Sequence, residues 1–323
     1  MIRIRFALAA IVGLAASLAH AAGFQRIEVP ASGVLPLLKG AVWYPCAEPT
    51  SDLKLGPFVL SVTKDCPVTG EKLPLVVISH GRTGSYLGHR DTAEALANAG
   101  FVVVAVNHPG DNATDKGRTD DFGVFVERPT DVKRVVDFML GAWPDAAKID
   151  AGRVGIFGFS RGGYTGLVAI GATLSSSKLR TLCEGVGRPD CDEVRNAPLP
   201  KLVHDPRIKA AVIADPFGGL LAADSFSDVR APVQLWASEH GGDGVSPENV
   251  AAIASWLPAK PEFHSVPNSQ HFAFLAPCPE DLAKSAPEIC ADAPGFDRAA
   301  FHQQFNADVL AFFRAHLMDA QPH

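Results

Sequence analysis

The residues best suited to chemistry in this chain lie in the segment Gly158-Phe159-Ser160-Arg161-Gly162. The segment joins a β-rich run at 153–160 to an apolar stretch with helical spacing at 161–174. A serine at a tight strand-to-helix turn can present its hydroxyl as a nucleophile, and glycines two residues before and after it leave room for the turn. The adjoining helix N-terminus favours the negative charge that develops during attack on a carbonyl carbon. Ser160 is therefore the candidate nucleophile.

A serine hydroxyl is a weak nucleophile near neutral pH and needs a positioned base. In the chain order serine, acid, histidine, the base follows the last strand of the sheet. His271 stands in that place, at the end of the strand-like run 261–271. Other histidines of the C-terminal part lie within that run, on the last predicted helix or at the terminus: His264, His302, His316 and His323. We therefore expect His271 to be the base.

Three carboxylates are candidates for the acid that would orient His271 and stabilise its imidazolium form. Asp243 is the first choice, because it lies in a Gly-rich loop after the strand-like run 232–239. Asp215, at the end of the preceding run, is the alternative, and Glu239 is the third candidate. The choice among them stays open at this point.

The segment His80-Gly81-Arg82-Thr83-Gly84 follows another β-rich run, at 73–80. An oxyanion hole needs two backbone N–H groups, one from the residue after the nucleophile and one from a loop after an earlier strand. These requirements predict the amides of Arg161 and Arg82 as the two donors. We expect the side chains of both arginines to be solvated or ion-paired.

The elements that must position these residues alternate along the chain, which predicts a mostly parallel sheet with helices on both faces. The expected strands lie at 73–80, 101–107, 153–160, 208–215, 232–239 and 261–271. The expected helices lie at 92–100, 129–140, 161–174, 247–257 and 297–317. The N-terminal part, with 41–45 as its clearest run, reads as antiparallel strands. A polar interruption at 172–207 is predicted to be an insertion, with a lid as one interpretation, within a single domain at 22–323.

The N-terminal segment and the net charge bear on the protein's location and partners. Arg3 and Arg5 precede a short apolar run, and Ala19-His20-Ala21 has the small-x-small pattern of a cleavage site, so residues 1–21 are predicted to be a signal peptide. We therefore expect a periplasmic or secreted protein. No later apolar stretch reaches the ~20 residues of a membrane span, so we expect no stable membrane insertion. The net charge of −6 argues against nucleic acid as a partner.

The six cysteines are consistent with export, because an even number in an oxidising compartment favours disulfides. The simplest of the 15 possible pairings is sequential, joining Cys46 to Cys66, Cys183 to Cys191 and Cys278 to Cys290. None of the cysteines has metal or redox spacing. The acidic segment 111–121 lacks the glycine that a calcium loop needs, since Lys116 occupies that position. We expect no cofactor.

Taken together, HGRTG after a strand, GFSRGG, the Asp243 loop and His271 resemble the α/β-hydrolase superfamily over nearly all of 22–323. AVWYP, ISHG, AVNHPGD and QHFAFLAPC resemble the bacterial predicted dienelactone hydrolase group. That group is similar to platelet-activating-factor acetylhydrolases and, more distantly, to cutinase-like polyester hydrolases. True dienelactone hydrolases use a cysteine, whereas this chain carries Ser160. The acetylhydrolase resemblance implies Asp215 as the acid, and the polyester hydrolase resemblance implies Asp243.

These observations predict an exported serine hydrolase with an α/β-hydrolase fold, which cleaves carboxylic esters through an acyl-enzyme. The expected substrate is a small-molecule, lipid-like or polymeric ester. Two alternatives remain open at the level of the sequence. One is a peptidase or amidase of the same fold, and the other is a catalytically silent hydrolase-like binding protein.

Overall fold

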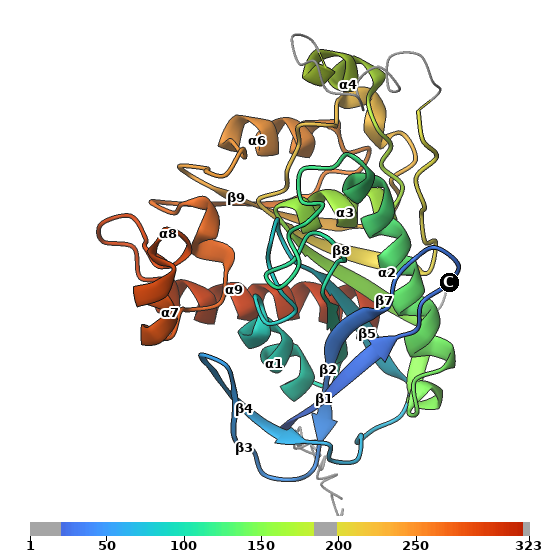
Figure 1. The fold of residues 1–323 in the computed structure, drawn as a ribbon, viewed down its shortest axis with the longest axis vertical. Helices are drawn as coiled ribbons and strands as arrows, with labels where there is room; N and C mark the ends of the chain where they lie inside the picture. Colours follow the sequence, from blue (N-terminus) through green and yellow to red (C-terminus); the bar gives the residue numbers. More distant parts are fainter. Residues whose placement is uncertain (1–20, 184–198, 319–323) are drawn as a thin grey trace, which may run out of the picture.

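A ten-stranded sheet runs through the described part of the chain, which in this computed structural model comprises residues 21–183 and 199–318. Its strand order is β10-β9-β8-β7-β5-β6-β2-β1-β4-β3 (Figure 1). The strands are β1 Ala21–Val29, β2 Leu38–Cys46, β3 Ser51–Leu55, β4 Phe58–Lys64, β5 Leu73–Ser79, β6 Val102–Val106, β7 Ile149–Phe159, β8 Ile208–Ala214, β9 Val233–Ser238 and β10 Glu262–Val266. The six strands from β10 to β6 are parallel, and β2 pairs antiparallel with β6.

Helices cover both faces of this sheet (Figure 1). The α-helices are α1 Arg90–Asn98, α2 Gly123–Gly141, α3 Arg161–Ala169, α4 Ser176–Cys183, α6 Pro247–Trp256, α7 Glu280–Ser285, α8 Pro287–Cys290 and α9 Arg298–Phe313. Short helical turns are η1 Ala146–Lys148, η2 Ala223–Phe226, η3 His271–Phe274 and η4 Arg314–Met318. The strands supply alternate residues to two separate cores, because successive side chains of a strand point to opposite faces. Leu75 and Val77 belong to the core that includes residues of α2, α3 and α6, and Val76 and Ile78 belong to the core that includes residues of α1 and α9.

The predicted fold class is confirmed: a mostly parallel sheet with helices on both faces. Every residue of β5 is buried, as a strand covered on both faces requires. Two boundaries differ from the sequence expectation. The last strand ends at Val266, because Pro267 has no N–H to donate and Asn268 has φ 55°. Helix α2 begins at Gly123, six residues before the predicted start, and it keeps Pro129 inside.

Two of the three predicted disulfides are present. Cys46 is bonded to Cys66, and Cys278 is bonded to Cys290. The third predicted pair involves Cys191, which lies outside the described residues. Within the predicted insertion at 172–207, residues 184–198 also lie outside them. Apart from Ala21, the first residue of β1, the predicted signal peptide also lies outside them.

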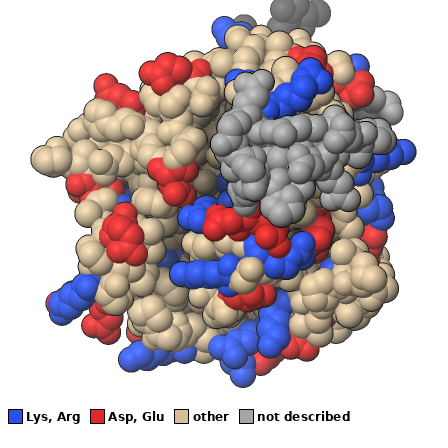
Figure 2. Space-filling model, turned by 45° about the horizontal axis from the view of Figure 1, so that its top comes forward, with Lys and Arg blue, Asp and Glu red and all other residues tan. Residues whose placement is uncertain are grey.

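The distribution of surface charge and the length of the apolar helices bear on possible partners. Within the residues that the structure describes, no helix is both long and apolar enough to cross a membrane. On the face drawn in Figure 2, basic and acidic side chains are interspersed, and neither sign forms an extended patch.

Candidate active site

Ser160 occupies a sharp turn between β7 and α3. Its backbone has φ 55° and ψ −119°, a conformation that is strained for a residue with a side chain. A Cβ on Gly158 would lie 2.2 Å from the Gly162 carbonyl oxygen, and a Cβ on Gly162 would lie 1.9 Å from the Ser79 carbonyl oxygen. Both flanking glycines are therefore required by the close approach of the backbone, as the sequence predicts.

His271 contacts Ser160 on one side and an aspartate on the other. His271 Nε2 lies 2.9 Å from Ser160 Oγ, and its Nδ1 lies 2.7 Å from Asp215 Oδ2. The three side chains are buried, with exposed fractions of 3% or less. The ring of Phe159 stacks on the imidazole with the centroids 4.7 Å apart. The structure thus forms a continuous hydrogen-bonded chain from a serine through a histidine to a carboxylate.

The carboxylate that the structure places against His271 is Asp215, the alternative offered by the sequence, and not Asp243, the first choice. Asp243 is exposed in the loop after β9 and is not hydrogen-bonded to His271. Glu239 accepts the backbone N–H of Asn268 instead. The reason is positional. Strand β8 pairs in parallel with β7, and Asp215 follows β8 as Ser160 follows β7. Asp215 therefore lies beside Ser160 at the same end of the sheet, where it reaches the His271 imidazole.

Ser238, at the end of β9, holds Asp215 in this orientation and was missed by the sequence reasoning. Its backbone N–H donates to Oδ1 of Asp215 at 3.0 Å, and its hydroxyl donates to Oδ2 at 2.7 Å. The Ser238 oxygen in turn accepts the N–H of Gly241 at 3.1 Å, and the Gly241 carbonyl accepts the N–H of His271 at 2.8 Å. One turn therefore fixes both Asp215 and His271. The only sequence signal was a hydroxyl residue at a strand end beside the candidate acid.

The loop after β5 packs directly against Ser160. A Cβ on Gly81 would lie 3.1 Å from the Ser160 Cβ. The Gly81 carbonyl oxygen lies 2.7 Å from Nδ1 of His80 and accepts the N–H of Gly84 at 3.2 Å. His80 Nε2 accepts the backbone N–H of His108, so Nδ1 carries the proton and donates it to the Gly81 carbonyl. These bonds orient the Gly81–Arg82 peptide, whose N–H is the predicted donor.

The side chains of the two arginines in the predicted oxyanion hole are ion-paired. Arg82 contacts Asp120 at 3.0 Å at the surface, and the largely buried Arg161 contacts Asp111 at 2.9 Å. The guanidinium of Arg161 also lies 4.6 Å from the ring centre of Phe125.

Full burial lowers the pKa of His80 well below its usual value, so this imidazole is neutral near pH 7.

A cavity of about 380 Å³ lies beside this arrangement. Its apolar lining is Phe159, Phe272, Leu275, Ala113, Ala286 and Ile289. The loop 80–85, Gly88, Lys116, Asp243 and Glu288 complete it. Gly81 and Phe159, which line the cavity, both adjoin Ser160, so the cavity lies beside the turn that carries this serine. Its volume suits a small ligand or one end of a larger one.

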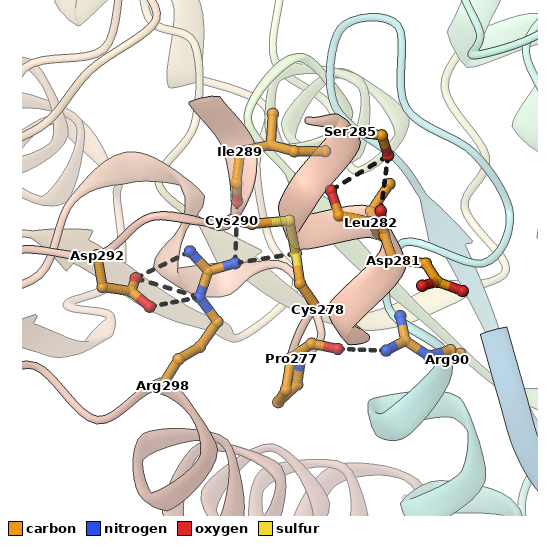
Figure 3. Close-up of a disulfide and its surroundings, with 10 residues drawn as sticks. All are labelled: Arg90, Pro277, Cys278, Asp281, Leu282, Ser285, Ile289, Cys290, Asp292 and Arg298. Atoms are coloured by element: carbon orange, nitrogen blue, oxygen red, sulfur yellow. Dashed lines mark hydrogen bonds and ion pairs between the residues drawn. A yellow bond between two sulfur atoms is a disulfide. The ribbon is translucent and has the colours of Figure 1, made fainter. Parts of the chain in front are cut away.

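The wall of the cavity formed by α8 is held in place from two directions (Figure 3). The Cys278–Cys290 disulfide joins the end of α8 to the segment that follows His271. The Arg298 guanidinium donates to the Ile289 carbonyl at 3.0 Å and to both oxygens of Asp292. Arg298 is 6% exposed, so these bonds are shielded from water. The wall is therefore tied both covalently and by a buried cation.

No metal site adds to this arrangement in the described ranges, where no group of three or more His, Cys, Asp and Glu side chains could hold an ion.

Comparisons with known proteins agree with the fold. Residues 45–120 match the family model described as platelet-activating factor acetylhydrolase, isoform II. The chain is similar in structure to a ferulic acid esterase from Streptomyces cinnamoneus, with a TM-score of 0.66 and 18% identity over 97% of this chain and 94% of that one. No curated protein sequence matches the chain significantly. The chain has the α/β-hydrolase fold and is similar to platelet-activating-factor acetylhydrolases in the matched segment.

Proposed function

We propose that this protein is a serine hydrolase that cleaves carboxylic esters through an acyl-enzyme, with Ser160, His271 and Asp215 as its catalytic residues. The observation that carries the proposal is the buried hydrogen-bonded chain from Ser160 Oγ through His271 to Asp215, at a strained turn beside a cavity. The match to an acetylhydrolase family model and the likeness to an esterase support esters as the substrate class. The two disulfides support export to the periplasm or beyond.

The proposed reaction proceeds in two halves. His271 Nε2 takes the proton of Ser160 as Oγ bonds to the ester carbonyl carbon, and the amides of Arg82 and Arg161 hold the resulting oxyanion. The imidazolium then gives its proton to the departing alcohol oxygen, which leaves an acyl group on Ser160. Water then attacks the acyl carbon with His271 again as base, and the bond between that carbon and Oγ breaks. The imidazolium returns its proton to Ser160 Oγ, and the carboxylic acid is released. Asp215 stays ionised throughout and keeps the Nδ1 proton in place.

A fluorophosphonate probe tests this proposal together with a panel of p-nitrophenyl esters and p-nitroanilides. We expect the probe to label Ser160 alone, because only a serine with a positioned base reacts readily. We also expect the esters to be hydrolysed and the anilides not. Absence of labelling would indicate a silent binding protein, and equal turnover of anilides would indicate an amidase.

The cavity wall at Ile289 sets the size of the ester group that fits beside Ser160. We expect Ile289→Ala to raise the ratio of kcat/KM for p-nitrophenyl octanoate to that for p-nitrophenyl acetate by about 10-fold, the low end for a change in an apolar pocket. Ile289→Trp should lower the same ratio, because the larger side chain fills the cavity. The measurement is initial rates with both esters for each variant.

The two disulfides provide a matched control for this expectation. Replacing Cys278 and Cys290 by serine should shift the ester ratio in the same direction as Ile289→Ala, since it releases one tie on the wall. Replacing Cys46 and Cys66 should leave the ratio unchanged, because neither residue lines the cavity. An identical ratio in every variant would show that α8 does not limit the substrate.

A further inference from the structure

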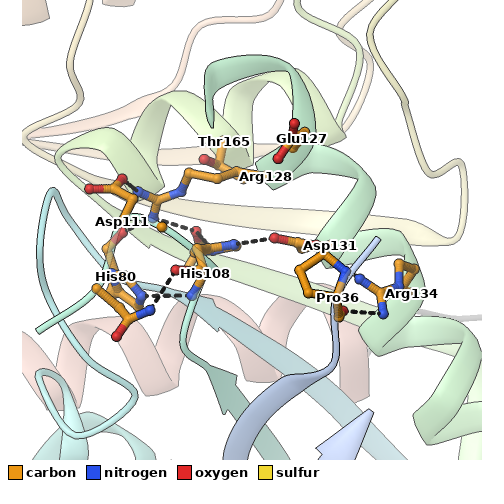
Figure 4. Close-up of polar contacts among 12 residues, drawn as sticks. Pro36, His80, His108, Asp111, Glu127, Arg128, Asp131, Arg134 and Thr165 are labelled. Carbon is orange, nitrogen blue, oxygen red and sulfur yellow. Dashed lines mark hydrogen bonds and ion pairs between the residues drawn. The ribbon is translucent and has the colours of Figure 1, made fainter. Parts of the chain in front are cut away.

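A buried ion cluster lies behind the loop that carries the proposed Arg82 donor (Figure 4). Asp111, from the loop after β6, and Arg128, in α2, have exposed fractions of 0% and 1%. Nη1 of Arg128 donates to Asp111 Oδ2 at 2.7 Å. Nη1 of Arg161 donates to the same oxygen at 2.9 Å. One carboxylate thus joins α2 to the residue that follows Ser160.

The same two residues also hold the backbone of the loop. Asp111 Oδ1 accepts the N–H of Thr83 at 3.1 Å, and Nη2 of Arg128 donates to the carbonyl of His80. These backbone groups flank the Gly81–Arg82 peptide on its two sides. Thr83 has φ 50°, which a residue with a side chain adopts only when its surroundings impose it. The pair therefore fixes a strained loop at both ends.

The charges of the cluster persist near neutral pH. Burial alone would raise the pKa of Asp111, but the guanidinium groups of Arg128 and Arg161 outweigh burial and hold it below its usual value. Burial lowers the pKa of Arg128 to about 10, which leaves it protonated at pH 7. Both partners are thus charged, and the contact between them is an ion pair.

Net stability does not explain such a pair. Moving two charges out of water costs several kcal/mol each, and apolar residues of similar volume often stabilise a fold at least as well. A guanidinium has a fixed fork of donors, which lets Arg128 serve the Asp111 carboxylate and the His80 carbonyl at the same time. Lysine offers a single point charge. The geometry of the pair is therefore suited to holding backbone groups at set positions.

We infer that Asp111 and Arg128 are positioning residues of the oxyanion hole, which hold the His80 and Thr83 backbone so that the intervening Arg82 amide meets the substrate oxygen. This inference rests on the proposed function of Ser160. Neither side chain touches the substrate or the reacting atoms. Their effect is exerted through the position of a backbone N–H.

Arg128→Lys tests the inference, because lysine keeps the charge but loses the fork. We expect kcat for p-nitrophenyl acetate to fall by about 10²-fold, the lower value for loss of one oxyanion donor, with KM changed by less than about 3-fold. Inhibition by phenylboronic acid, which forms a tetrahedral adduct with the serine, should weaken by the same factor as kcat. A role confined to the fold would leave this inhibition constant unchanged in the folded variant.

Arg134→Lys is the matched control, with the same substitution in the same helix. Arg134 donates to Asp131 and to the carbonyl oxygens of Pro30 and Pro36, none of which belongs to the loop 80–85. Its kcat and its boronic acid inhibition should equal those of the unaltered protein, whatever its melting temperature. Equal losses of kcat in the two variants would overturn the inference.

Asp111→Asn is the second variant, which retains an oxygen for the Thr83 amide but removes the charge that holds Arg128. It should show the same parallel loss of kcat and boronic acid affinity, measured at low temperature on protein whose circular dichroism is native. Failure of both Arg128→Lys and Asp111→Asn to fold would also overturn the inference, because loss of a brace on one loop leaves the sheet intact. If Ser160→Ala is inactive and Arg128→Lys has an unchanged kcat, this inference is rejected and the proposed function stands. If Ser160→Ala is active, the proposed function itself is rejected.

Discussion

Ser160→Ala should reduce kcat for p-nitrophenyl esters by at least ~10⁴-fold, since removal of the nucleophile of a serine triad costs several orders of magnitude. Alanine removes only the hydroxyl, and its methyl group fits the space that the Ser160 Cβ already occupies. The backbone strain at φ 55° stays the same, so we expect a melting temperature close to that of the unaltered protein. Initial rates and a thermal melt on the same preparation measure both quantities.

The control for this result is labelling by the fluorophosphonate probe. The unaltered protein should gain one adduct on the peptide that contains Ser160, and Ser160→Ala should gain none. More than a few per cent of residual activity in a preparation free of contaminating esterase would exclude Ser160 as the nucleophile. Loss of activity accompanied by loss of native circular dichroism would instead assign Ser160 a role in the fold.

Asp215→Asn should lower kcat by at least ~10³-fold, which is somewhat less than the loss known for this substitution in a serine protease triad. The amide of asparagine would present N–H groups to Nδ1 of His271. The imidazole would then carry its proton on Nε2, facing Ser160, and could not accept the serine proton. Ser238 would keep a hydrogen-bond partner, so the fold should be retained. The measurement is kcat at saturating ester.

Asp243→Asn is the matched comparison, because it makes the same chemical change one loop away. Asp243 is exposed and lines the cavity, so its replacement should change kcat by less than ~10-fold and act mainly on KM. The opposite ordering of the two variants would return the acid to Asp243. Similar modest losses in both would direct attention to Glu239.

The sequence predicted the parts of this molecule that depend on local pattern. Runs such as β5 and β8 are apolar over most of their length, which is typical of parallel strands covered on both faces. The glycines on either side of Ser160 indicate a tight turn from the residue types of five consecutive positions. His271 could be chosen because it follows the last strand of an ordered series.

The carboxylate that contacts His271 could not be predicted in the same way, because the choice depends on contacts between distant segments. Asp215 and Asp243 each follow a core strand, and both have positive φ. What separates them is that Ser238 donates twice to Asp215 and that the Gly241 carbonyl holds the His271 backbone. A single sequence contains no signal for this set of bonds.

The start of α2 was missed for a related reason. Pro129 is a common first residue of a helix, and the sequence therefore predicted a start there. The observed helix extends back to Gly123, and Phe125 in its first turns packs against Tyr164 and Phe217 at 5.3 Å and 5.5 Å between ring centres. Tertiary packing thus adds six residues that local propensity assigns to a loop. Arg128 lies within this added part.

The stretch that bears Ile289 has a consequence for how substrate range can change. Residues 278–290 contribute no strand to the sheet, and a covalent bond closes the stretch upon itself. The segment 278–290 can thus be replaced without altering a strand of the sheet. A new sequence between the two cysteines can reshape the cavity while the ladder bonds of the sheet and the chain from Ser160 to Asp215 stay in place. The substrate range can therefore change through this segment alone, without a change in the residues that form the sheet.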